Sequence, residues 1–339
     1  MNPGQMKIHL SPVKETELIT LLPARAAHSV HTLTNSPEDA DLVLLVGSFG
    51  TEPHYLLENP LYRAFPDKCA VYTEDDNYLP LAPGVYCSAI VDQHSRAGRT
   101  FTWSYASASG QSANRFVTTS GTEKRYLFSF LGGSTSLLRK RMFNLSFNRP
   151  KSGLACLIEN TSTYYHWDLA QAGREQRQQR YAEILAASHF VLCPRGAGTG
   201  SIRFFEVMQA GIAPVLLADD YLLPPNVPWD TFLLRIPEKD IARLPELLEP
   251  HLSTAAERGR LAREAWLEHF APEKEFDAIV SLAHTALHHG PPDEAVFRRQ
   301  QPSIIARFER RRKLRDLTRN AVLGTLRLLR LKPPYQMNR

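Results

Sequence analysis

The residues between 193 and 206 have the types and spacing that bind a diphosphate. An apolar run ends at Cys193, and the turn PRGAGTG that follows it places glycines at positions 196, 198 and 200. Small residues of this kind let backbone N–H groups approach an anion closely. Ser201 then begins a predicted helix, whose first N–H groups and dipole also favour a phosphate. We therefore expect Gly196, Gly198, Gly200 and Ser201 to contact a bound diphosphate.

Two arginines and a glutamate accompany this turn. Arg195 lies within it, and Arg203 lies on the predicted helix, three residues before Glu206. Planar, permanently charged guanidinium groups can neutralise a leaving diphosphate, so Arg195 and Arg203 are candidate catalytic residues. Glu206 lies on the same helix face as Arg203 and can accept hydrogen bonds from ribose hydroxyls. The combination predicts a site for a nucleoside-diphosphate sugar.

Two other interpretations of the turn compete with this one. The stretch could be an ordinary strand-to-helix turn whose arginines are surface charges. It could also be a dinucleotide-binding fingerprint, because Asp219 and Asp220 follow about twenty residues later, as a ribose-binding acid would. The glycine spacing is G-x-G-x-G rather than G-x-G-x-x-G, and Pro194-Arg195 does not suit a tight dinucleotide turn. An NAD-dependent reductase is therefore disfavoured.

A longer pattern extends this motif as far as Pro224. The sequence reads CPRG…S-x-R-x-x-E-x-x-x-x-G-x-x-P-V-x-L-x-D-x-Y-x-L-P. It closely resembles the C-terminal donor-binding motif of the exostosin-like family of inverting glycosyltransferases. Residues 39–46, 126–133 and 229–248 resemble the family more weakly, in the same order. The resemblance covers roughly residues 39 to 270.

The resemblance implies a fold and a chemistry. The fold is α/β and of the GT-B type, with two doubly wound, Rossmann-like domains facing a cleft and helices at the C-terminus. The chemistry is transfer from a nucleoside-diphosphate sugar, with UDP favoured, and with inversion at the anomeric carbon. Neither a metal nor a cofactor is expected. The family is also the reason to expect Gly132 and Gly133 to face the donor phosphates, although they could simply end a strand.

Three further charged residues are candidates around the donor. Arg139 and Arg141 follow Gly133 on a predicted helix, and Arg139 is the candidate for a donor contact. A solvated helix face is the alternative for both arginines. Asp219 follows a predicted strand at the sheet edge where the sugar should lie, and it could hold sugar hydroxyls. Asp219 and Asp220 could instead form a turn.

An inverting transfer needs a general base for the acceptor hydroxyl. The best-placed acids are Glu74, Asp75 and Asp76, directly after a predicted strand, and adjacent carboxylates tend to raise one another's pKa. We expect Asp76 to be the base, although the three could form a solvated loop. Rival bases and aromatic residues that could stack on sugars complete the candidates: His54, His94, His166, Trp103, Tyr105, Tyr164, Tyr165 and Trp167.

The order of predicted elements indicates two α/β domains. Strands expected near 6–10, 41–46, 68–72 and 100–103 alternate with helices, and a small polar stretch over 105–125 separates them from a second alternating series. The second series has strands near 126–131, 154–158, 189–193, 213–218 and 231–235. We expect an acceptor-side domain over 1–122, a nucleotide-sugar domain over 123–290 and a basic helical tail over 291–339.

Composition and charge restrict the location and the partners. With 339 residues, 43% hydrophobic and 22% charged, the chain is typical of a globular protein. Four dispersed cysteines suggest reduced thiols, and no apolar run reaches the roughly 20 residues that span a bilayer. Because residues 1–15 contain no basic-then-apolar stretch, we expect no secretory signal there. We expect a cytoplasmic, bacterial enzyme, with a peripheral position on the inner membrane face as one option.

The C-terminal tail is strongly basic. Residues 298–339 contain 13 Lys and Arg but only two acidic residues, Glu309 and Asp316, so their net charge is +11. The net charge of the whole chain is +5. The tail could be a surface helix that returns to the N-terminal domain, or an interfacial helix on anionic lipid. Nucleic-acid binding is disfavoured because no nucleic-acid-binding fold accompanies the charge.

These observations predict an inverting, metal-independent glycosyltransferase. Its expected partners are a nucleoside-diphosphate sugar and a glycan or lipid-linked saccharide acceptor, and no nucleic acid is expected. The alternative is a non-catalytic protein of the same fold that binds a sugar nucleotide or a glycan. Slow release of nucleoside diphosphate without acceptor would separate the enzyme from the binder.

Overall fold

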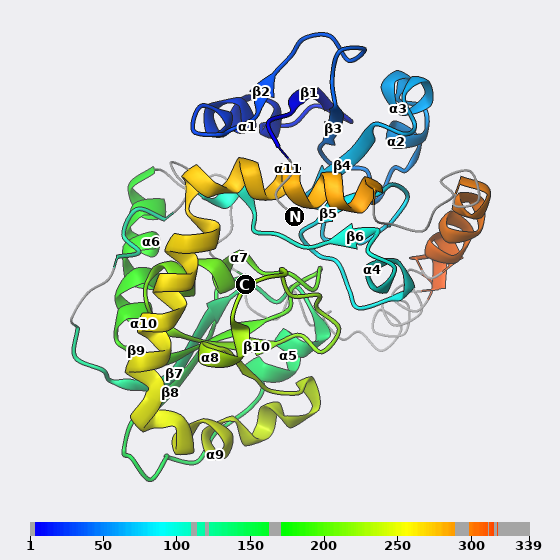
Figure 1. Ribbon diagram of the computed structural model, residues 1–339. Coiled ribbons are helices and arrows are strands. Elements are labelled where there is room, and N and C mark those ends of the chain that lie inside the picture. Colours follow the sequence, from blue (N-terminus) through cyan, green and yellow to red (C-terminus); the bar gives the residue numbers. More distant parts are fainter. Residues whose placement is uncertain are drawn as a thin grey trace. The chain divides into compact units, whose positions relative to one another are not determined.

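Two parallel sheets form the framework of the computed structural model (Figure 1). The structure describes residues 4–109, 114–118, 122–162, 171–288, 298–310, 312–314 and 317. The first sheet contains, in spatial order, β2 (Thr32–Leu33), β1 (Lys7–Pro12), β3 (Leu42–Val46), β4 (Cys69–Thr73), β5 (Gly84–Tyr86) and β6 (Thr100–Phe101). Its central strands are continuous apolar runs, because a parallel sheet is covered on both faces.

The second sheet begins after the linker region. Its spatial order is β11 (Leu234–Arg235), β10 (Ala213–Leu217), β9 (Ser188–Pro194), β7 (Tyr126–Gly132) and β8 (Ala155–Asn160). All pairings are parallel, so β7, β9 and β10 end at the same edge. Ligands of such sheets bind beyond the carboxyl ends of the strands, which are the ends that carry Gly132 and Arg195.

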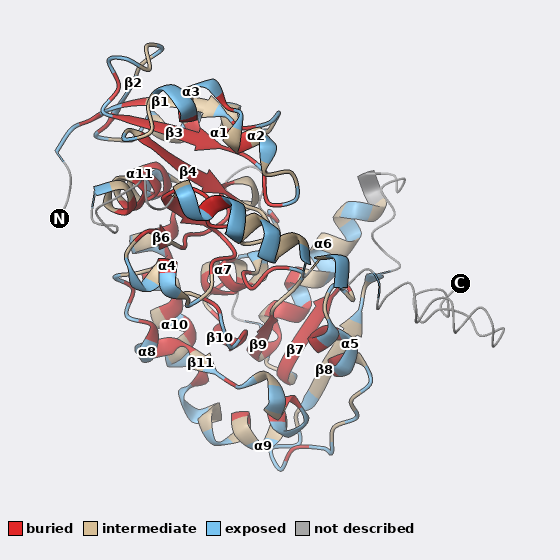
Figure 2. Cartoon of the chain, turned by 90° about the vertical axis from the view of Figure 1, so that its right-hand side faces the viewer, coloured by how far each residue is buried: buried red, intermediate tan, exposed pale blue. Residues whose placement is uncertain are grey.

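Helices cover both sheets, and their outer faces are exposed while the central strands are buried (Figure 2). The helices associated with the first series are α1 (Leu18–Ala26), α2 (His54–Leu57), α3 (Pro60–Ala64) and α4 (Gln93–Arg96). Those of the second series are α5 (Leu137–Phe143), α6 (Gln171–Ala186), α7 (Ile202–Gln209), α8 (Trp229–Phe232), α9 (Leu244–Leu248), α10 (Ala255–Ala265) and α11 (Pro272–His288). Short 3-10 segments include η1 (Ala106–Ala108), η4 (Glu238–Arg243) and η5 (Glu249–Thr254), and a π-helical turn, η6 (Trp266–Phe270), joins α10 to α11. Among the described residues, no helix is long and apolar enough to cross a membrane.

The prediction of an α/β fold with two parallel sheets is confirmed. Two details differ from it. The strand expected over 231–235 is shorter and is limited to Leu234–Arg235, which pairs with β10, because the first two residues of that range belong to the helical turn α8, in which Trp229 and Phe232 are buried. Strands β2 and β5 were missed because two or three residues are too few to show a period.

The chain returns to the first sheet near its end. Helix α11 packs against β4 and β5, although it lies within the range expected for the second domain. Both sheets belong to one contact unit, Met1–Pro291, and Pro292–Arg339 forms another. In the second unit, residues 298–310 are helical. The structure therefore ties both sheets together through a C-terminal helix that is not the basic tail.

Candidate functional site

The glycine-rich turn packs closely against the chain that follows β5. A Cβ atom on Gly198 would lie 2.3 Å from Ser88 Oγ, and one on Gly200 would lie 2.3 Å from the Cys87 carbonyl oxygen. Thr199 Oγ1 donates a hydrogen bond to the Ser88 carbonyl at 2.7 Å. These two glycines are therefore required by backbone contact with the first-sheet side, a reason that the sequence analysis did not anticipate. The outer part of the turn, Gly196 and Ala197, stays accessible.

The same segment, residues 87–91, also pairs with the loop after β10. The Val91 N–H donates to the Asp220 carbonyl at 2.9 Å, and the Leu222 N–H donates to the Ala89 carbonyl at 3.1 Å. Ile90 and Tyr221 form an antiparallel bridge. The 87–91 segment is thus held between two strand-end loops of the second sheet. We call this arrangement the seam.

Asp76 reaches the seam from the end of β4. Its side chain is exposed, and its Oδ1 accepts a hydrogen bond from the Gly198 N–H at 3.2 Å. The neighbouring Asp75 is used locally, because its Oδ2 accepts hydrogen bonds from the N–H groups of Phe49 and Gly50 at 2.8 and 2.7 Å. Of these two aspartates, Asp76 is the one that faces the donor turn. Its carboxylate shows that an anion can sit on an N–H group of this turn.

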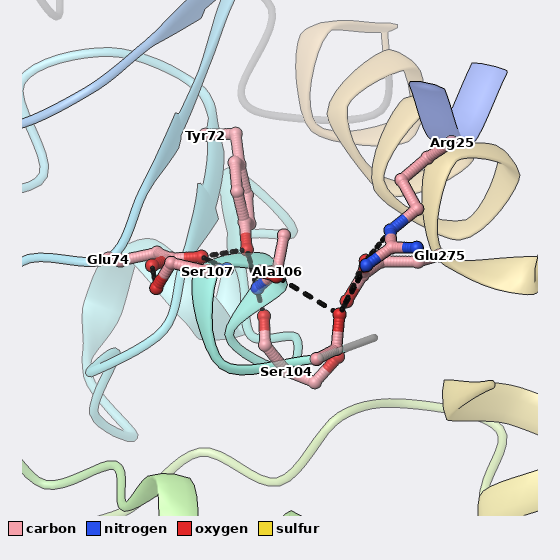
Figure 3. Close-up of polar contacts among 8 residues, drawn as sticks. Arg25, Tyr72, Glu74, Ser104, Ala106, Ser107 and Glu275 are labelled. Atoms are coloured by element: carbon pink, nitrogen blue, oxygen red, sulfur yellow. Dashed lines mark hydrogen bonds and ion pairs between the residues drawn. The ribbon is translucent and has the colours of Figure 1, made fainter. Parts of the chain in front are cut away.

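Glu74 is half-buried and lies in a hydrogen-bond network (Figure 3). Its Oε1 accepts hydrogen bonds from the Tyr72 hydroxyl at 2.8 Å and from the Ser107 N–H at 3.0 Å. Burial raises the pKa of Glu74, and the hydrogen bonds from Ser107 and Tyr72 act against that rise. Because both carboxylate oxygens bond to the protein, Glu74 holds the chain after β6 rather than facing a substrate.

A second carboxylate holds the other end of this chain. Glu275 of α11 is fully buried and forms an ion pair with Arg25 of α1 at 3.2 Å, and it accepts hydrogen bonds from Ser109 Oγ (Figure 3). Burial raises the pKa of Glu275 to about 7, and the Arg25 charge limits that rise. Glu74 and Glu275 together fix the segment from Ser104 to Ser109. That segment carries Tyr105, whose hydroxyl would lie 2.4 Å from a Cβ atom on Gly200.

Arg195 is the candidate cation with a free side chain. It is half-buried, and its guanidinium makes no hydrogen bond or ion pair with any residue that the structure describes. Its backbone is fixed, because the Arg195 N–H donates to the Leu217 carbonyl at 3.0 Å. A fixed backbone and an uncommitted guanidinium are suited to binding an anion from solution.

Arg139 has a different environment from the one expected. It is buried, and its guanidinium donates to the carbonyls of Arg195 at 3.1 Å, Pro194 at 2.9 Å and Gly133 at 3.4 Å. It therefore ties the loop after β7 to the loop after β9. Gly133 is buried in the first of these loops. The structure shows that Arg139 shapes both loops, and its contact with a donor stays a prediction.

Arg203 and Glu206 lie together on α7. Arg203 Nη2 donates to the Leu131 carbonyl, and its guanidinium carbon lies 4.6 Å from the Phe130 ring centroid. A Cβ atom on Gly132 would lie 3.0 Å from Arg203 Nη2, so this glycine makes room for the guanidinium. Glu206 is half-buried, and its Oε2 accepts a hydrogen bond from the Tyr181 hydroxyl at 2.8 Å. Burial raises the pKa of Glu206, while Tyr181 and Arg203 act against that rise.

The remaining donor candidates lie at the strand ends. Ser201 is the N-cap of α7 in an extended conformation, but its side chain makes no capping hydrogen bond. Asp219 and Asp220 lie in a turn, and Asp219 Oδ1 accepts a hydrogen bond from the Glu238 N–H at the start of η4 at 3.0 Å. Asp219 also lines a cavity of about 480 Å³ with Arg235, Ile236 and Lys239. This cavity adjoins β10, the strand whose end contacts Arg195.

The rival bases and aromatics are placed less favourably. His94 is buried on α4, and burial lowers its pKa. His54 is exposed and stacks on Tyr55. Trp103 is buried against Phe270, with ring centroids 4.8 Å apart. The candidates His166, Tyr164, Tyr165 and Trp167 lie outside the described residues.

Three contributors to the site were missed in the sequence. Ser88 and Thr199 belong to the seam, and Tyr181 belongs to the α7 pair. Thr199 stands inside the glycine motif, so its position was a usable signal. Ser88 and Tyr181 carry no motif, and only the tertiary structure brings them to the site.

A family model described as the Exostosin GT47 domain matches residues 80–250, half of the chain. Exostosin-1 homolog of Caenorhabditis elegans is 36% identical over 113 residues, which are 32% of this chain and 29% of that protein. Probable glucuronoxylan glucuronosyltransferase IRX7 of Arabidopsis thaliana is 36% identical over 78 residues, 22% of this chain and 17% of that protein. The chain thus matches less than a third of these curated relatives' length.

Solved structures were also compared. The crystal structure of a glycosyltransferase from Rickettsia africae has a TM-score of 0.45 at 9% identity, covering 84% of this chain and all of that chain. Anabaena Alr3699/HepE in complex with UDP has a TM-score of 0.35 at 13% identity, covering 83% of this chain and 98% of that chain. The family assignment rests on the sequence match, which spans both the seam and the donor turn. The chain belongs to the exostosin GT47 domain family.

Proposed function

We propose that this protein is an inverting glycosyltransferase that moves a sugar from a nucleoside diphosphate, with UDP favoured, to a glycan or lipid-linked saccharide. The observation that carries this proposal is the contact between Asp76 Oδ1 and the Gly198 N–H at 3.2 Å. It joins the exposed carboxylate at the end of β4 to the donor turn of the second sheet. An acceptor-side base and a donor-side anion site must be neighbours in an inverting transferase.

The proposed step is a single displacement at the anomeric carbon. Asp76 takes the proton of the acceptor hydroxyl while the oxygen of that hydroxyl forms a bond to the anomeric carbon. The bond between the carbon and the diphosphate oxygen breaks, and its electron pair stays on the nucleoside diphosphate. Arg195 and the N–H groups at the outer part of the turn stabilise the developing charge. Glu206 holds the ribose, Arg203 supports the diphosphate, and no metal takes part.

The cavity beside Asp219 and the basic tail also have roles in this proposal. The cavity of about 480 Å³ beside Asp219 is large enough for part of a nucleotide sugar, and it lies at the carboxyl ends of β10 and β11. Relatives named glucuronosyltransferases support glycosyl transfer as the class of reaction. The basic tail would hold the enzyme at an anionic membrane surface on the cytoplasmic side, near a lipid-linked acceptor.

The direct test is release of nucleoside diphosphate from a panel of UDP- and GDP-sugars by the purified full chain. We expect slow hydrolysis of at least one donor without acceptor, an increase when a suitable glycan is added, and no loss of either rate in EDTA. NMR of the product should show the inverted anomer. Binding of the donor without any release would instead indicate the non-catalytic sugar-nucleotide binder.

A further inference from the structure

Tyr181 contacts both proposed donor residues of α7 from a neighbouring helix. Its hydroxyl donates to Glu206 Oε2 at 2.8 Å. Its ring centroid lies 5.7 Å from the Arg203 guanidinium carbon, and the Phe130 ring lies 4.6 Å from the same carbon. An aromatic ring from α6 and another from β7 therefore hold one guanidinium by cation–π contacts.

We propose that Tyr181 is a positioning residue of the donor site, which orients the Glu206 carboxylate through its hydroxyl and the Arg203 guanidinium through its ring. This inference rests on the proposed function. The Glu206 Oε1 atom accepts no hydrogen bond from the described part of the chain. Because Tyr181 occupies only Oε2, the carboxylate is held in one orientation and keeps an oxygen for a ribose hydroxyl.

The charged and titratable groups around Glu206 support this role. The other titratable or charged groups facing it are Arg203 on its own helix, Cys193 on β9 and Tyr105 at the small cavity that Glu206 also lines. Burial raises the pKa of Cys193 to about 12 and that of Tyr105 well above its ordinary value, so both are neutral near pH 7. Tyr181 and Arg203 are thus the two groups that oppose the rise in the Glu206 pKa caused by burial.

The test is UDP affinity of Tyr181→Phe from pH 5 to 8, measured by calorimetry. The ring stays, so Arg203 keeps its contact, but Glu206 loses its hydrogen bond. We expect UDP binding to weaken about three- to tenfold at pH 7.5, in line with the loss of one hydrogen bond to a charged group. Binding should fail at a higher pH than in the wild type, because Glu206 without its donor becomes protonated at a higher pH. The kcat with saturating donor should change less than about twofold.

A double-mutant cycle separates positioning from general destabilisation. In a Glu206→Gln background, Tyr181→Phe should cause no further loss of the pH-dependent component of UDP binding. Tyr62→Phe serves as the matched control, because its hydroxyl donates to the Leu81 carbonyl on the first-sheet side. A Tyr181→Phe enzyme with wild-type affinity and a wild-type pH midpoint would overturn the inference. Failure of the wild type to bind any nucleoside diphosphate would overturn the proposed function instead.

Discussion

The side chains of adjacent residues have different tasks at the end of β4. The carboxylates of Glu74 and Asp75 accept hydrogen bonds from residues on the first-sheet side, whereas the Asp76 carboxylate is exposed and accepts one from the Gly198 N–H of the glycine-rich turn. The two arginines beside the donor turn differ in the same way. The Arg139 guanidinium donates hydrogen bonds to three backbone carbonyls, whereas the Arg195 guanidinium donates none to the described residues. Residue type alone could not have distinguished members of these pairs.

Replacement of Asp76 should separate chemistry from binding. Asp76→Asn keeps an oxygen for the Gly198 N–H but cannot take a proton. We expect kcat to fall about 10²- to 10⁴-fold, while UDP affinity changes little. Steady-state kinetics and calorimetry on the same preparations check this. Glu58→Gln, an exposed change on α2's flank, is the control, and equal kcat in Asp76→Asn and the wild type would remove Asp76 as the base.

At the scale of elements, much of the framework followed from the sequence. The apolar runs of β3 and β4 predicted two buried strands close to their observed positions. Gly211 predicted the end of α7, and its φ of 70° is typical of a glycine that terminates a helix. The seam could not be predicted, because it depends on backbone-to-backbone approach between residues more than a hundred positions apart. Gly198 and Gly200 are also required by close contact with Ser88 and Cys87, which their spacing in the sequence does not indicate.

The seam should therefore be sensitive to a single methyl group. Gly200→Ala places a Cβ atom 2.3 Å from the Cys87 carbonyl oxygen, so the turn or the 87–91 segment must shift. We expect a loss of about 1–3 kcal/mol in the free energy of unfolding, measured with urea. Gly173→Ala on α6 is the control, since nothing lies within 4 Å of its added Cβ atom. The control should be neutral or slightly stabilising. Equal stability of Gly200→Ala and the wild type would argue against the close packing of the seam.

The packing of α11 on α1 should make stability depend on pH. The folded-state pKa of Glu275 is about 7, above its ordinary value of 4.5, so its protonated form is favoured in the folded protein. Its contribution is full below about pH 4.5 and is lost as the pH rises through about 7, on the order of 3 kcal/mol in total. Urea unfolding at pH 5 and pH 8 should show this decline, and Glu275→Gln should flatten it. An unchanged slope in Glu275→Gln would contradict the assignment.

At the scale of the whole molecule, charge is distributed unevenly. Residues 298–339 carry +11 while the total is +5, so the rest of the chain is acidic by six charges. Leu314 and Leu317 are 58% and 65% exposed within this basic segment. Exposed leucines among arginines are typical of segments that bind an anionic lipid surface.

We expect the full chain to bind vesicles that contain phosphatidylglycerol and not to bind vesicles of phosphatidylcholine. Each basic residue at the surface contributes about 1 kcal/mol, so Arg307→Gln with Arg310→Gln should weaken binding by about tenfold or more. Co-sedimentation at low and high salt checks both points. Arg243→Gln together with Arg260→Gln is a charge-matched control outside the tail. Equal binding to both lipids would exclude electrostatic attachment through the tail.

The central claim is that the turn after β9 grips the diphosphate of a sugar nucleotide with Arg195. Titration of UDP into the wild type, Arg195→Ala and the exposed control Arg243→Ala tests it most directly. The account predicts saturable binding to the wild type and to Arg243→Ala, and at least about tenfold weaker binding to Arg195→Ala, since a charge-assisted hydrogen-bond donor is lost. Wild-type affinity in Arg195→Ala, or no nucleotide binding to the wild type at all, would contradict it.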